Sequence, residues 1–381
     1  MKVKLGDICE IVGGSTPKSN VPEYWDGNVK WITPAELNED SYVLCDSVRK
    51  ITELGVQKTG LTSFPAGTVI LSSRAPIGKV AIAGCEMYCN QGFKNLICSD
   101  AINNKFLYWF LKGKTDYLNS LGRGATFKEI SKQIVANIEI ELPPIERQER
   151  IADQFEMIAS VLRHRHEQLS ALDDLIKARF VEMFGDPMTN VKGYELKKYG
   201  DVFELNAGGT PSKTHPEYWE GGTISWIGSN MCQDRYIYAN DGKFITQEGY
   251  DNSSARLFPI DTVLVALVGA TIGKTALLKI ETTTNQNVLG IRGIRESGYL
   301  PEFVYYYTQG LYKKFIGISD GGFSMASKGF ISELPIPVVP VVLQEEFTSF
   351  ADQVDKSKVV VQKALDEAQI LFDSLMQQYF G

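Results

Sequence analysis

The chain carries the same set of motifs twice, in the same order. Gly6-Asp7-Ile8 returns as Gly200-Asp201-Val202, and Ile77-Gly78-Lys79 returns as Ile272-Gly273-Lys274, so the offset stays between 194 and 196 residues. Solenoid repeats are roughly 20–50 residues long, which makes this period a duplicated domain followed by a spacer. Two similar but diverged modules suit a protein that recognises two different targets a set distance apart.

Proline-containing hinges mark the ends of the two modules. Leu142-Pro143-Pro144 closes the first and Val338-Val339-Pro340 closes the second. After each hinge, apolar residues recur at three- and four-residue steps, which is typical of one face of a helix. We predict a first module over residues 1–145, a central helix over 146–185, a second module over 186–342 and a C-terminal helix over 343–381.

Each module is predicted to mix short strands, turns and one helix, near residues 104–121 in the first and 301–316 in the second. The long helices after the hinges carry apolar seams that neither can bury alone. We expect them to pack on each other as a coiled coil. The alternative is that each lies on its own module. The fold class is therefore α+β, with two mixed α/β domains separated by two long helices.

The net charge is -7, which is unusual for a nucleic-acid-binding protein. Residues 1–145 carry 16 Lys and Arg against 15 Asp and Glu, whereas residues 343–381 carry 3 against 7. The acidic excess is thus densest in the last helical segment. Any DNA binding by the modules must rest on local basic clusters, with modest affinity from phosphate contacts alone.

The lack of membrane-spanning and signal segments, together with the cysteine pattern, indicates a cytoplasmic protein. No run of about 18 apolar residues is present, so we expect no membrane span. The first seven residues lack the apolar stretch of a signal peptide. Five of the six cysteines lie in the first repeat, and Cys85 and Cys89 lack a second pair at zinc-like spacing. We expect free structural thiols and no metal site.

Catalytic motifs are not found at a convincing spacing. Gly269 to Thr275 resembles a phosphate-binding loop, but Val268 stands where that loop needs glycine. In the first repeat, Lys79 is followed by Val80, so the hydroxyl that would bind magnesium is lost. His164 and His166 sit two positions apart on a helix and cannot share a face. The sequence predicts no catalytic residues.

Taken in order, the motifs resemble the specificity subunits of Type I restriction-modification systems. They comprise a Gly-Asp start, Gly-x-Thr-Pro followed by Tyr-Trp and Trp-Ile, and Phe-Pro-x-Gly-Thr-Val. Ile-Gly-Lys, Asn-Gln and a Gly-rich turn follow, and Pro-Pro-x-x-x-Gln-Glu leads into the first long helix. Each motif alone is weak. The resemblance covers essentially the whole chain because most of them occur twice in the same order.

This resemblance implies a non-catalytic subunit in which each module is a target-recognition domain for half of a bipartite double-stranded DNA site. The long helices would form an antiparallel coiled coil in a pseudo-two-fold arrangement, set the spacing of the half-sites and dock two modification (methyltransferase) subunits. Restriction (translocase/nuclease) subunits are further expected partners. The chain would need no cofactor, since S-adenosylmethionine is expected on the modification subunit. A coiled-coil adaptor without DNA reading and a DNA-modifying enzyme in its own right are the alternatives.

The candidate DNA-binding residues lie in loops rich in small, polar and basic side chains. Arg can fork onto guanine and Asn or Gln onto adenine, while Ser, Thr and Lys mostly contact phosphates. Arg74 and Arg123 are not repeated as Arg, which favours base-specific contacts, and Lys79 is expected to contact a phosphate. The candidates are Ser15, Thr16, Lys18, Ser72, Ser73, Arg74, Lys79, Asn90, Gln91, Lys94, Arg123, Thr126, Lys128, Thr210, Ser212, Lys213, Lys274, Asn285, Gln286, Ser324 and Lys328.

Some of these candidates have a structural alternative. The Gly-Ser-Thr-Pro turn recurs in both modules, and a shared turn favours a structural role over reading of different sequences. Asn90-Gln91 also recurs, so it fits either the bracing of a loop or a contact with the DNA backbone. The paired tryptophans, Trp25 with Trp31 and their counterparts, recur in register and are expected in the core.

Overall fold

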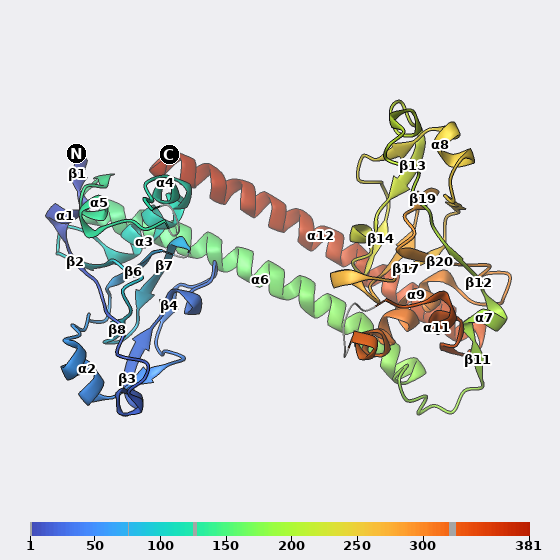
Figure 1. Ribbon diagram of the computed structural model, residues 1–381, viewed down its shortest axis with the longest axis horizontal. Helices are drawn as coiled ribbons and strands as arrows, with labels where there is room; N and C mark the ends of the chain where they lie inside the picture. Colours follow the sequence, from blue (N-terminus) through green and yellow to red (C-terminus); the bar gives the residue numbers. More distant parts are fainter. Residues whose placement is uncertain (1, 75, 125–127, 320–324) are drawn as a thin grey trace. The chain divides into compact units, whose positions relative to one another are not determined.

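The computed structural model describes residues 2–74, 76–124, 128–319 and 325–381. The chain divides into two compact units (Figure 1). The first unit comprises residues 1–166 and 363–381, and the second comprises residues 167–362. Each unit therefore contains one globular module together with parts of both long helices. Within the described residues, none of the helices combines the length and apolar character that crossing a membrane requires.

The first unit is built on a five-stranded sheet of order β2-β9-β6-β7-β4 and a three-stranded sheet of order β5-β3-β8. All five residues of the central strand β6 are buried. The strands are β1 (Lys2–Lys4), β2 (Cys9–Val12), β3 (Trp25–Ile32), β4 (Val43–Leu44), β5 (Lys50–Ile51), β6 (Val69–Ser73), β7 (Ile77–Ala83), β8 (Tyr88–Cys89), β9 (Asn95–Cys98) and β10 (Glu139–Glu141), of which β1 pairs with β10.

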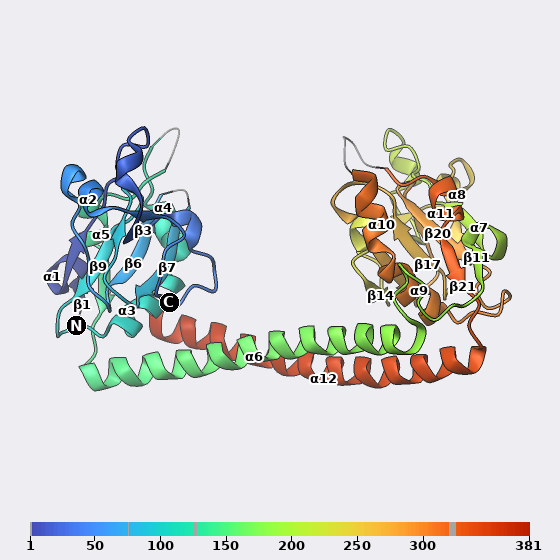
Figure 2. The same cartoon turned by 90° about the horizontal axis from the view of Figure 1, so that it is seen from below.

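Helix α3 (Asn104–Gly113) covers this sheet, and Figure 2 shows it between the sheet and the long helices. Its first turn is capped by Asn103, whose side chain accepts from the backbone N–H groups of Lys105 and Phe106. Its residues Phe106–Leu111 are all buried. The other helices of this module are α1 (Leu5–Ile8), η1 (Pro22–Tyr24), η2 (Pro34–Glu36), α2 (Glu53–Thr59), α4 (Thr115–Ser120) and α5 (Lys132–Ala136).

The single helix predicted over 104–121 is two helices, α3 and α4. The break falls at Lys114, which follows Gly113 and leaves the helical conformation with φ -107° and ψ 18°. The Thr115 hydroxyl donates to the Lys112 carbonyl at 3.0 Å, so a side chain satisfies a carbonyl at the end of α3. In the second module the predicted helix over 301–316 breaks in the same way, after Gly310.

The second unit repeats this topology. Its five-stranded sheet has the order β12-β20-β17-β18-β14, and a four-stranded sheet has the order β15-β13-β19-β16. In both modules the last pair of the five-stranded sheet is parallel and the other pairs are antiparallel. Corresponding strands therefore meet in corresponding directions, which confirms two repeated mixed α/β domains.

The strands of the second unit are β11 (Leu196–Lys198), β12 (Glu204–Ala207), β13 (Ile224–Ile227), β14 (Arg235–Ile237), β15 (Phe244–Ile245), β16 (Leu257–Phe258), β17 (Val263–Ala266), β18 (Thr275–Leu278), β19 (Thr282–Thr284), β20 (Val288–Arg292) and β21 (Pro335–Pro337). Its shorter helices are α7 (Tyr199–Val202), η3 (Pro216–Tyr218), η4 (Ser229–Met231), α8 (Gln247–Asp251), η5 (Gly269–Thr271), α9 (Pro301–Gly310), α10 (Tyr312–Ile316), η6 (Gly317–Ser319) and α11 (Lys328–Ser332). Strand β11 pairs with β21, as β1 pairs with β10 in the first unit.

The long helices are α6 (Ile145–Phe184) and α12 (Val341–Phe380). In the first unit the beginning of α6 packs against the end of α12, because the Phe155 ring lies 5.6 Å from that of Phe372 and 5.5 Å from that of Phe380. The Tyr379 hydroxyl also donates to the Gln154 side-chain oxygen at 3.3 Å.

In the second unit the end of α6 packs against the beginning of α12. The ring of Phe180 lies 5.1 Å from that of Phe347, and Arg179 forms an ion pair with Glu346 at 2.8 Å. Lys358 of α12 also pairs with Asp173 of α6 at 2.7 Å, so a later position on α12 meets an earlier position on α6. The two helices therefore run antiparallel in the second unit, as predicted. The pseudo-two-fold arrangement of the modules stays a prediction.

The long helices combine the two packing arrangements that the sequence allowed, packing on each other and packing on the modules. The helices pack on each other, and their ends also complete the cores of the modules. Phe155 stacks on Trp109 of α3 at 5.5 Å, and Phe180 stacks on Phe303 of α9 at 5.6 Å. The apolar seam therefore has two partners at each end of the helix pair.

Candidate nucleic-acid interface

A pair of tryptophans supports the Gly-Ser-Thr-Pro loop of the first module. The indole N–H of Trp31 donates to the Ser15 carbonyl at 3.0 Å, and that of Trp25 donates to the Lys18 carbonyl at 3.2 Å. The two rings meet edge to face, 5.2 Å apart. Both rings are buried, so their hydrogen bonds hold the loop backbone against the core. Ser15, Thr16 and Lys18 stay exposed.

The second module repeats these bonds. The indole of Trp226 donates to the Gly209 carbonyl at 3.1 Å, and that of Trp219 donates to the Ser212 carbonyl at 3.2 Å. Their rings are again 5.2 Å apart. The loop that carries Thr210, Ser212 and Lys213 is thus held by the same two contacts, although its side chains differ.

The Asn-Gln turn braces the same loop. In the first module the Thr16 hydroxyl donates to the Gln91 side-chain oxygen at 2.5 Å, and Asn90 accepts from the backbone N–H of Gly92 at 2.8 Å. The turn thus braces the loop, which is one of the two roles considered for it, and a contact with the DNA backbone stays a prediction.

The second module forms the same bonds, Thr210 to Gln286 at 2.5 Å and the backbone N–H of Asn287 to Asn285 at 3.1 Å. The glutamine is exposed in both modules.

Three further segments of the first module converge beside this turn. The Lys94 ammonium donates to the Ser73 hydroxyl at 3.2 Å and pairs with the Glu129 carboxylate at 3.1 Å. Arg123 and Glu129 exchange both backbone hydrogen bonds, at 3.0 and 2.9 Å. Arg74 forms a β-bridge with Glu129 as well. Loops far apart in the sequence therefore form one surface at the end of β6, which we call the first-module rim (residues 15–18, 73–74, 90–94, 123–124 and 128–129).

Several candidate DNA-binding residues use their side chains for contacts within the protein. Ser72 and Ser73 are fully buried, and Ser72 donates to the Pro76 carbonyl and accepts from the backbone N–H of Lys79, both at 2.8 Å. Contrary to the expectation of a phosphate contact, the Lys79 ammonium donates to the Leu37 carbonyl. Lys94 has only 15% of its side chain exposed and is neutralised by Glu129. These residues shape the rim more than they offer groups to DNA.

Other candidates remain available. Lys18, Arg123 and Lys128 are exposed and Arg74 is half-buried. The side chains of these four residues make no hydrogen bond or ion pair within the part of the chain that the structure describes. Thr126 and Ser324 lie outside the described residues. The rim thus offers two guanidinium groups and two ammonium groups to a polyanion.

The rim of the second module is less basic. Lys274 forms an ion pair with Asp234 at 2.5 Å and lies 4.8 Å from the Tyr312 ring centre. Lys213 and Lys328 are exposed. The counterpart of Arg74 is Val268, which forms the equivalent β-bridge with Met325. The two modules therefore share their scaffold and differ at the surface that the scaffold presents.

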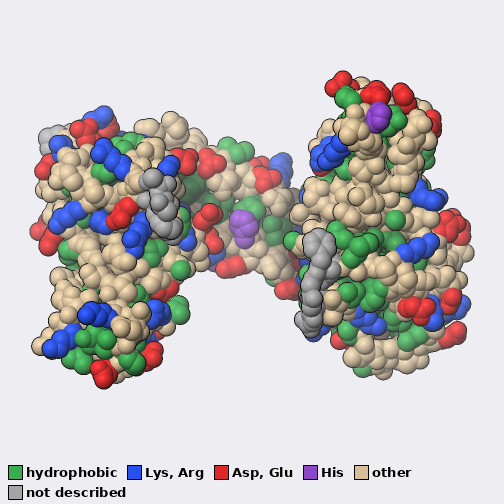
Figure 3. Space-filling view, viewed as in Figure 1, with side chains coloured by type: hydrophobic (Ala, Val, Ile, Leu, Met, Phe, Trp, Pro, Cys, Tyr) green, Lys and Arg blue, Asp and Glu red, His purple; other side chains and the backbone are tan. Residues whose placement is uncertain are grey.

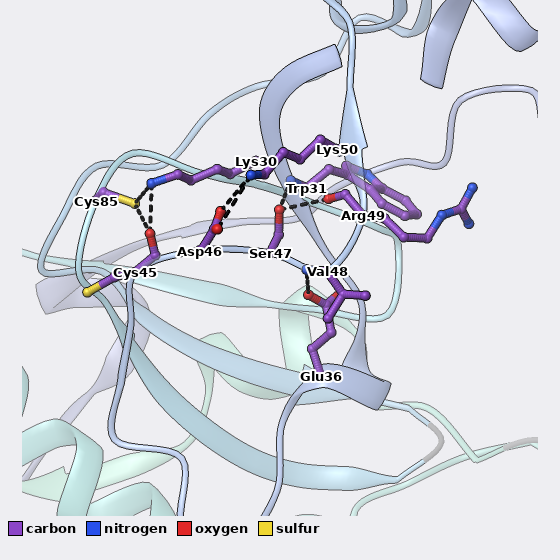
Figure 4. Close-up of polar contacts among 10 residues, drawn as sticks. All are labelled: Lys30, Trp31, Glu36, Cys45, Asp46, Ser47, Val48, Arg49, Lys50 and Cys85. Atoms are coloured by element: carbon purple, nitrogen blue, oxygen red, sulfur yellow. Dashed lines mark hydrogen bonds and ion pairs between the residues drawn. The ribbon is translucent and has the colours of Figure 1, made fainter. Parts of the chain in front are cut away.

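Arg49 is a candidate that sequence reasoning missed. Its guanidinium carbon lies 3.8 Å from the Trp25 ring centre, and the residue is exposed. Figure 4 shows how the segment before it is tied down: Lys30 donates to the Cys45 carbonyl at 2.7 Å, and the backbone N–H of Trp31 donates to the Ser47 hydroxyl at 3.1 Å. Because these contacts are tertiary, no local motif marks Arg49.

Basic and acidic side chains are interspersed over the face of the first module seen in Figure 3. This matches the near balance of charge in its sequence. A surface of mixed charge binds a polyanion through a few well-placed groups, since total phosphate neutralisation is small. Among the described residues, no cluster of three or more His, Cys, Asp or Glu side chains could hold a metal ion.

The cysteines are free, as expected. Burial raises the pKa of the Cys89 and Cys232 thiols to about 12. These two thiols are therefore protonated at neutral pH and are poor nucleophiles.

A family model described as Type I restriction modification DNA specificity domain matches residues 1–171 and 191–368. The specificity subunit of Type I restriction enzyme MjaIX from Methanocaldococcus jannaschii is 34% identical over 242 residues, or 59% of this chain and 56% of that protein. The EcoR124I/EcoR124II specificity subunit from Escherichia coli is 30% identical over 115 residues, or 29% of this chain and 28% of that protein. The chain thus aligns with about half or less of the length of these relatives.

Solved structures are similar over the full length. The S subunit of a Type I restriction-modification system from M. genitalium has a TM-score of 0.59 at 15% identity, covering 100% of this chain and 96% of that one. A chain from a study of assembly and conformational transition in a type I restriction-modification system has a TM-score of 0.61 at 18% identity, covering 100% and 97%. At these identities the likeness concerns the fold. The family match on both modules shows that the chain belongs to the Type I restriction-modification DNA specificity family.

Proposed function

We propose that this chain is the non-catalytic specificity subunit of a Type I restriction-modification complex and that each module reads half of a bipartite DNA target. The observation that carries this proposal is the contrast between an identical scaffold and different rims. The same threonine–glutamine and tryptophan–carbonyl bonds hold the loops in both modules, yet Arg74 in one corresponds to Val268 in the other. A scaffold kept constant beneath a varied surface suits recognition of two different sequences.

We infer that α6 and α12 also dock modification subunits, which would carry S-adenosylmethionine. Large apolar side chains remain exposed on both helices, although their seams are satisfied by each other and by the modules. Met157 is 70% exposed on α6, and Val359, Val360 and Ile370 are each 69% exposed on α12. Exposed apolar residues that recur along a helix pair fit a protein-binding surface. Restriction subunits would join the same complex, and a complex that acts on cellular DNA would work in the cytoplasm.

Methylome sequencing tests this function. The chain is expressed with its cognate modification subunit in a host without other Type I systems. We expect methylation at a bipartite sequence only when both chains are present. The purified chain alone should neither bind S-adenosylmethionine nor cut DNA. Methylation that is independent of this chain would favour the adaptor alternative, and turnover by the isolated chain would favour an enzyme.

A module exchange tests separate reading of the half-sites. Replacing residues 1–145 by the corresponding module of another family member should change one half of the target and leave the other half intact. A parallel exchange of residues 186–342 should change the other half. A replacement that alters both halves would contradict separable reading by the two modules.

A further inference from the structure

The β-bridge beside the rim has a different chemistry in each module. In the first module it joins Arg74 to Glu129, and in the second it joins Val268 to Met325. Arg74 directly follows β6, and Val268 lies just beyond the corresponding strand, β17. The same place in the fold thus holds a guanidinium with a carboxylate in one module and two apolar side chains in the other.

The apolar pair is fixed by backbone hydrogen bonds on both sides. The N–H of Ala326 donates to the Leu267 carbonyl at 2.9 Å, and the N–H of Leu267 donates to the Asn287 carbonyl at 2.8 Å. Val268 is half-buried against the core of the second module, whereas Met325 is 58% exposed. A β-branched side chain held by the core therefore lies beside a flexible thioether that can adapt to a partner.

Polar and basic residues surround this pair. Asn287 adjoins it through the hydrogen bond to Leu267, and Gln286 precedes Asn287 on the braced turn. Lys328 is exposed three residues after Met325. Two apolar side chains within such surroundings are too small an area for a stable protein partner, which buries about 800 Å² on each side. They are large enough to enclose a single methyl group.

We propose that Val268 and Met325 contact the 5-methyl group of a thymine in the half-site read by the second module. This inference rests on the proposed DNA-reading function. In the major groove a thymine is marked by its methyl group, which apolar side chains recognise, whereas guanine offers two acceptors that suit an arginine. The second module thereby specifies an A·T pair at the place where the first module presents Arg74.

Uracil substitution tests this contact. Once methylome sequencing has given the target, each thymine of the second half-site is replaced in turn by deoxyuridine, which pairs identically but lacks the methyl group. Binding is measured with the full chain in complex with its modification subunit. One replacement should weaken binding by about fourfold, the effect expected for one buried methyl group.

Variants assign the effect to the two residues. Met325→Ala and Val268→Ala should weaken binding to the thymine duplex and should respond much less to the same uracil. Ile260→Ala is the matched control, because this exposed isoleucine lies before β17, at the opposite end of that strand from Val268, and it should keep the full uracil response. Because Met325 is exposed, its truncation is not expected to unfold the module, which circular dichroism checks.

The double variant Val268→Arg with Met325→Glu transplants the pair found in the first module. It should abolish the uracil response and shift the preferred base at that position toward guanine. A second half-site without thymine on either strand, or a uracil response that persists undiminished in both alanine variants, would overturn the inference. A complex that methylates no bipartite site would instead overturn the proposed function, and with it this contact.

Discussion

The Lys94 ammonium and the Glu129 carboxylate form an ion pair at 3.1 Å within the first-module rim. The lysine also donates to the buried Ser73 hydroxyl, so its position is set by β6 and by the segment that contains Glu129. The carboxylate cancels one positive charge on a surface proposed to meet DNA. We therefore expect it to weaken any binding that depends on phosphate contacts alone.

Glu129→Gln should raise the affinity of the complex for DNA of any sequence. The change removes a carboxylate that repels phosphates and leaves the charge of Lys94 uncompensated. The slope of log affinity against log salt concentration should steepen by about 0.9, the value for one additional phosphate contact. Fluorescence anisotropy over a salt series measures both quantities. Glu139→Gln, an equal charge change on the exposed side of β10, should have little effect. Equal slopes for the two variants would contradict the assignment.

Arg74→Ala and Lys128→Ala should have different effects on DNA binding, the first on specificity and the second on general affinity. Loss of Arg74 should relax specificity at one base position of the first half-site. The discrimination against the wrong base should fall by about 1–3 kcal/mol if the guanidinium makes two hydrogen bonds to one base. Loss of Lys128 should weaken binding to all sequences alike and lower the salt slope by about 0.9. Competition between target and mutated duplexes separates the two effects. Identical behaviour of both variants toward all duplexes would show that Arg74 reads no base.

Gln148→Ala should destabilise the junction between the first module and α6. The buried Gln148 amide accepts from the Asn103 N–H at 2.8 Å and donates to the carbonyls of Ala101 and Pro143 at 3.1 and 2.9 Å. Truncation leaves these backbone groups unsatisfied, which should lower the free energy of unfolding by about 2–3 kcal/mol. Urea unfolding measures this loss. Gln133→Ala, at an exposed site on α5, is the control and should change stability by less than about 0.5 kcal/mol.

Four residues inserted after Ser160 should lengthen the unread gap of the target by one or two base pairs and leave both half-sites unchanged. The insertion adds about 6 Å to α6 and keeps its seam almost in phase, since a turn takes 3.6 residues. A single inserted residue rotates the seam by about 100° and should disrupt the pairing instead. Methylome sequencing of both variants is the measurement. A gap that stays the same after the longer insertion would show that the helices do not set the spacing.

The sequence predicted the repeat, the mixed α/β modules and the long helices because these follow from local periodicity and motif order. It could not rank the rim residues, because their partners lie far away in the chain. Lys79 and Arg74 are only five positions apart, yet Lys79 is bound to the carbonyl of Leu37, 42 residues earlier, while Arg74 remains available. Arg49 was missed because only the folded chain brings it over Trp25.

The first unit is formed by two segments that lie far apart in the sequence, which affects its folding during synthesis on the ribosome. Residues 363–381 belong to this unit, and Phe380 packs against Phe106, Phe110 and Phe155. The second unit, by contrast, is one continuous stretch, residues 167–362. The first unit must therefore wait for residues 363–381 to be synthesised before its core closes, at least about 10 s after residue 166 at typical elongation rates. During that delay its aromatic residues are exposed to chaperones, whereas the second unit takes all its residues from one stretch of the chain.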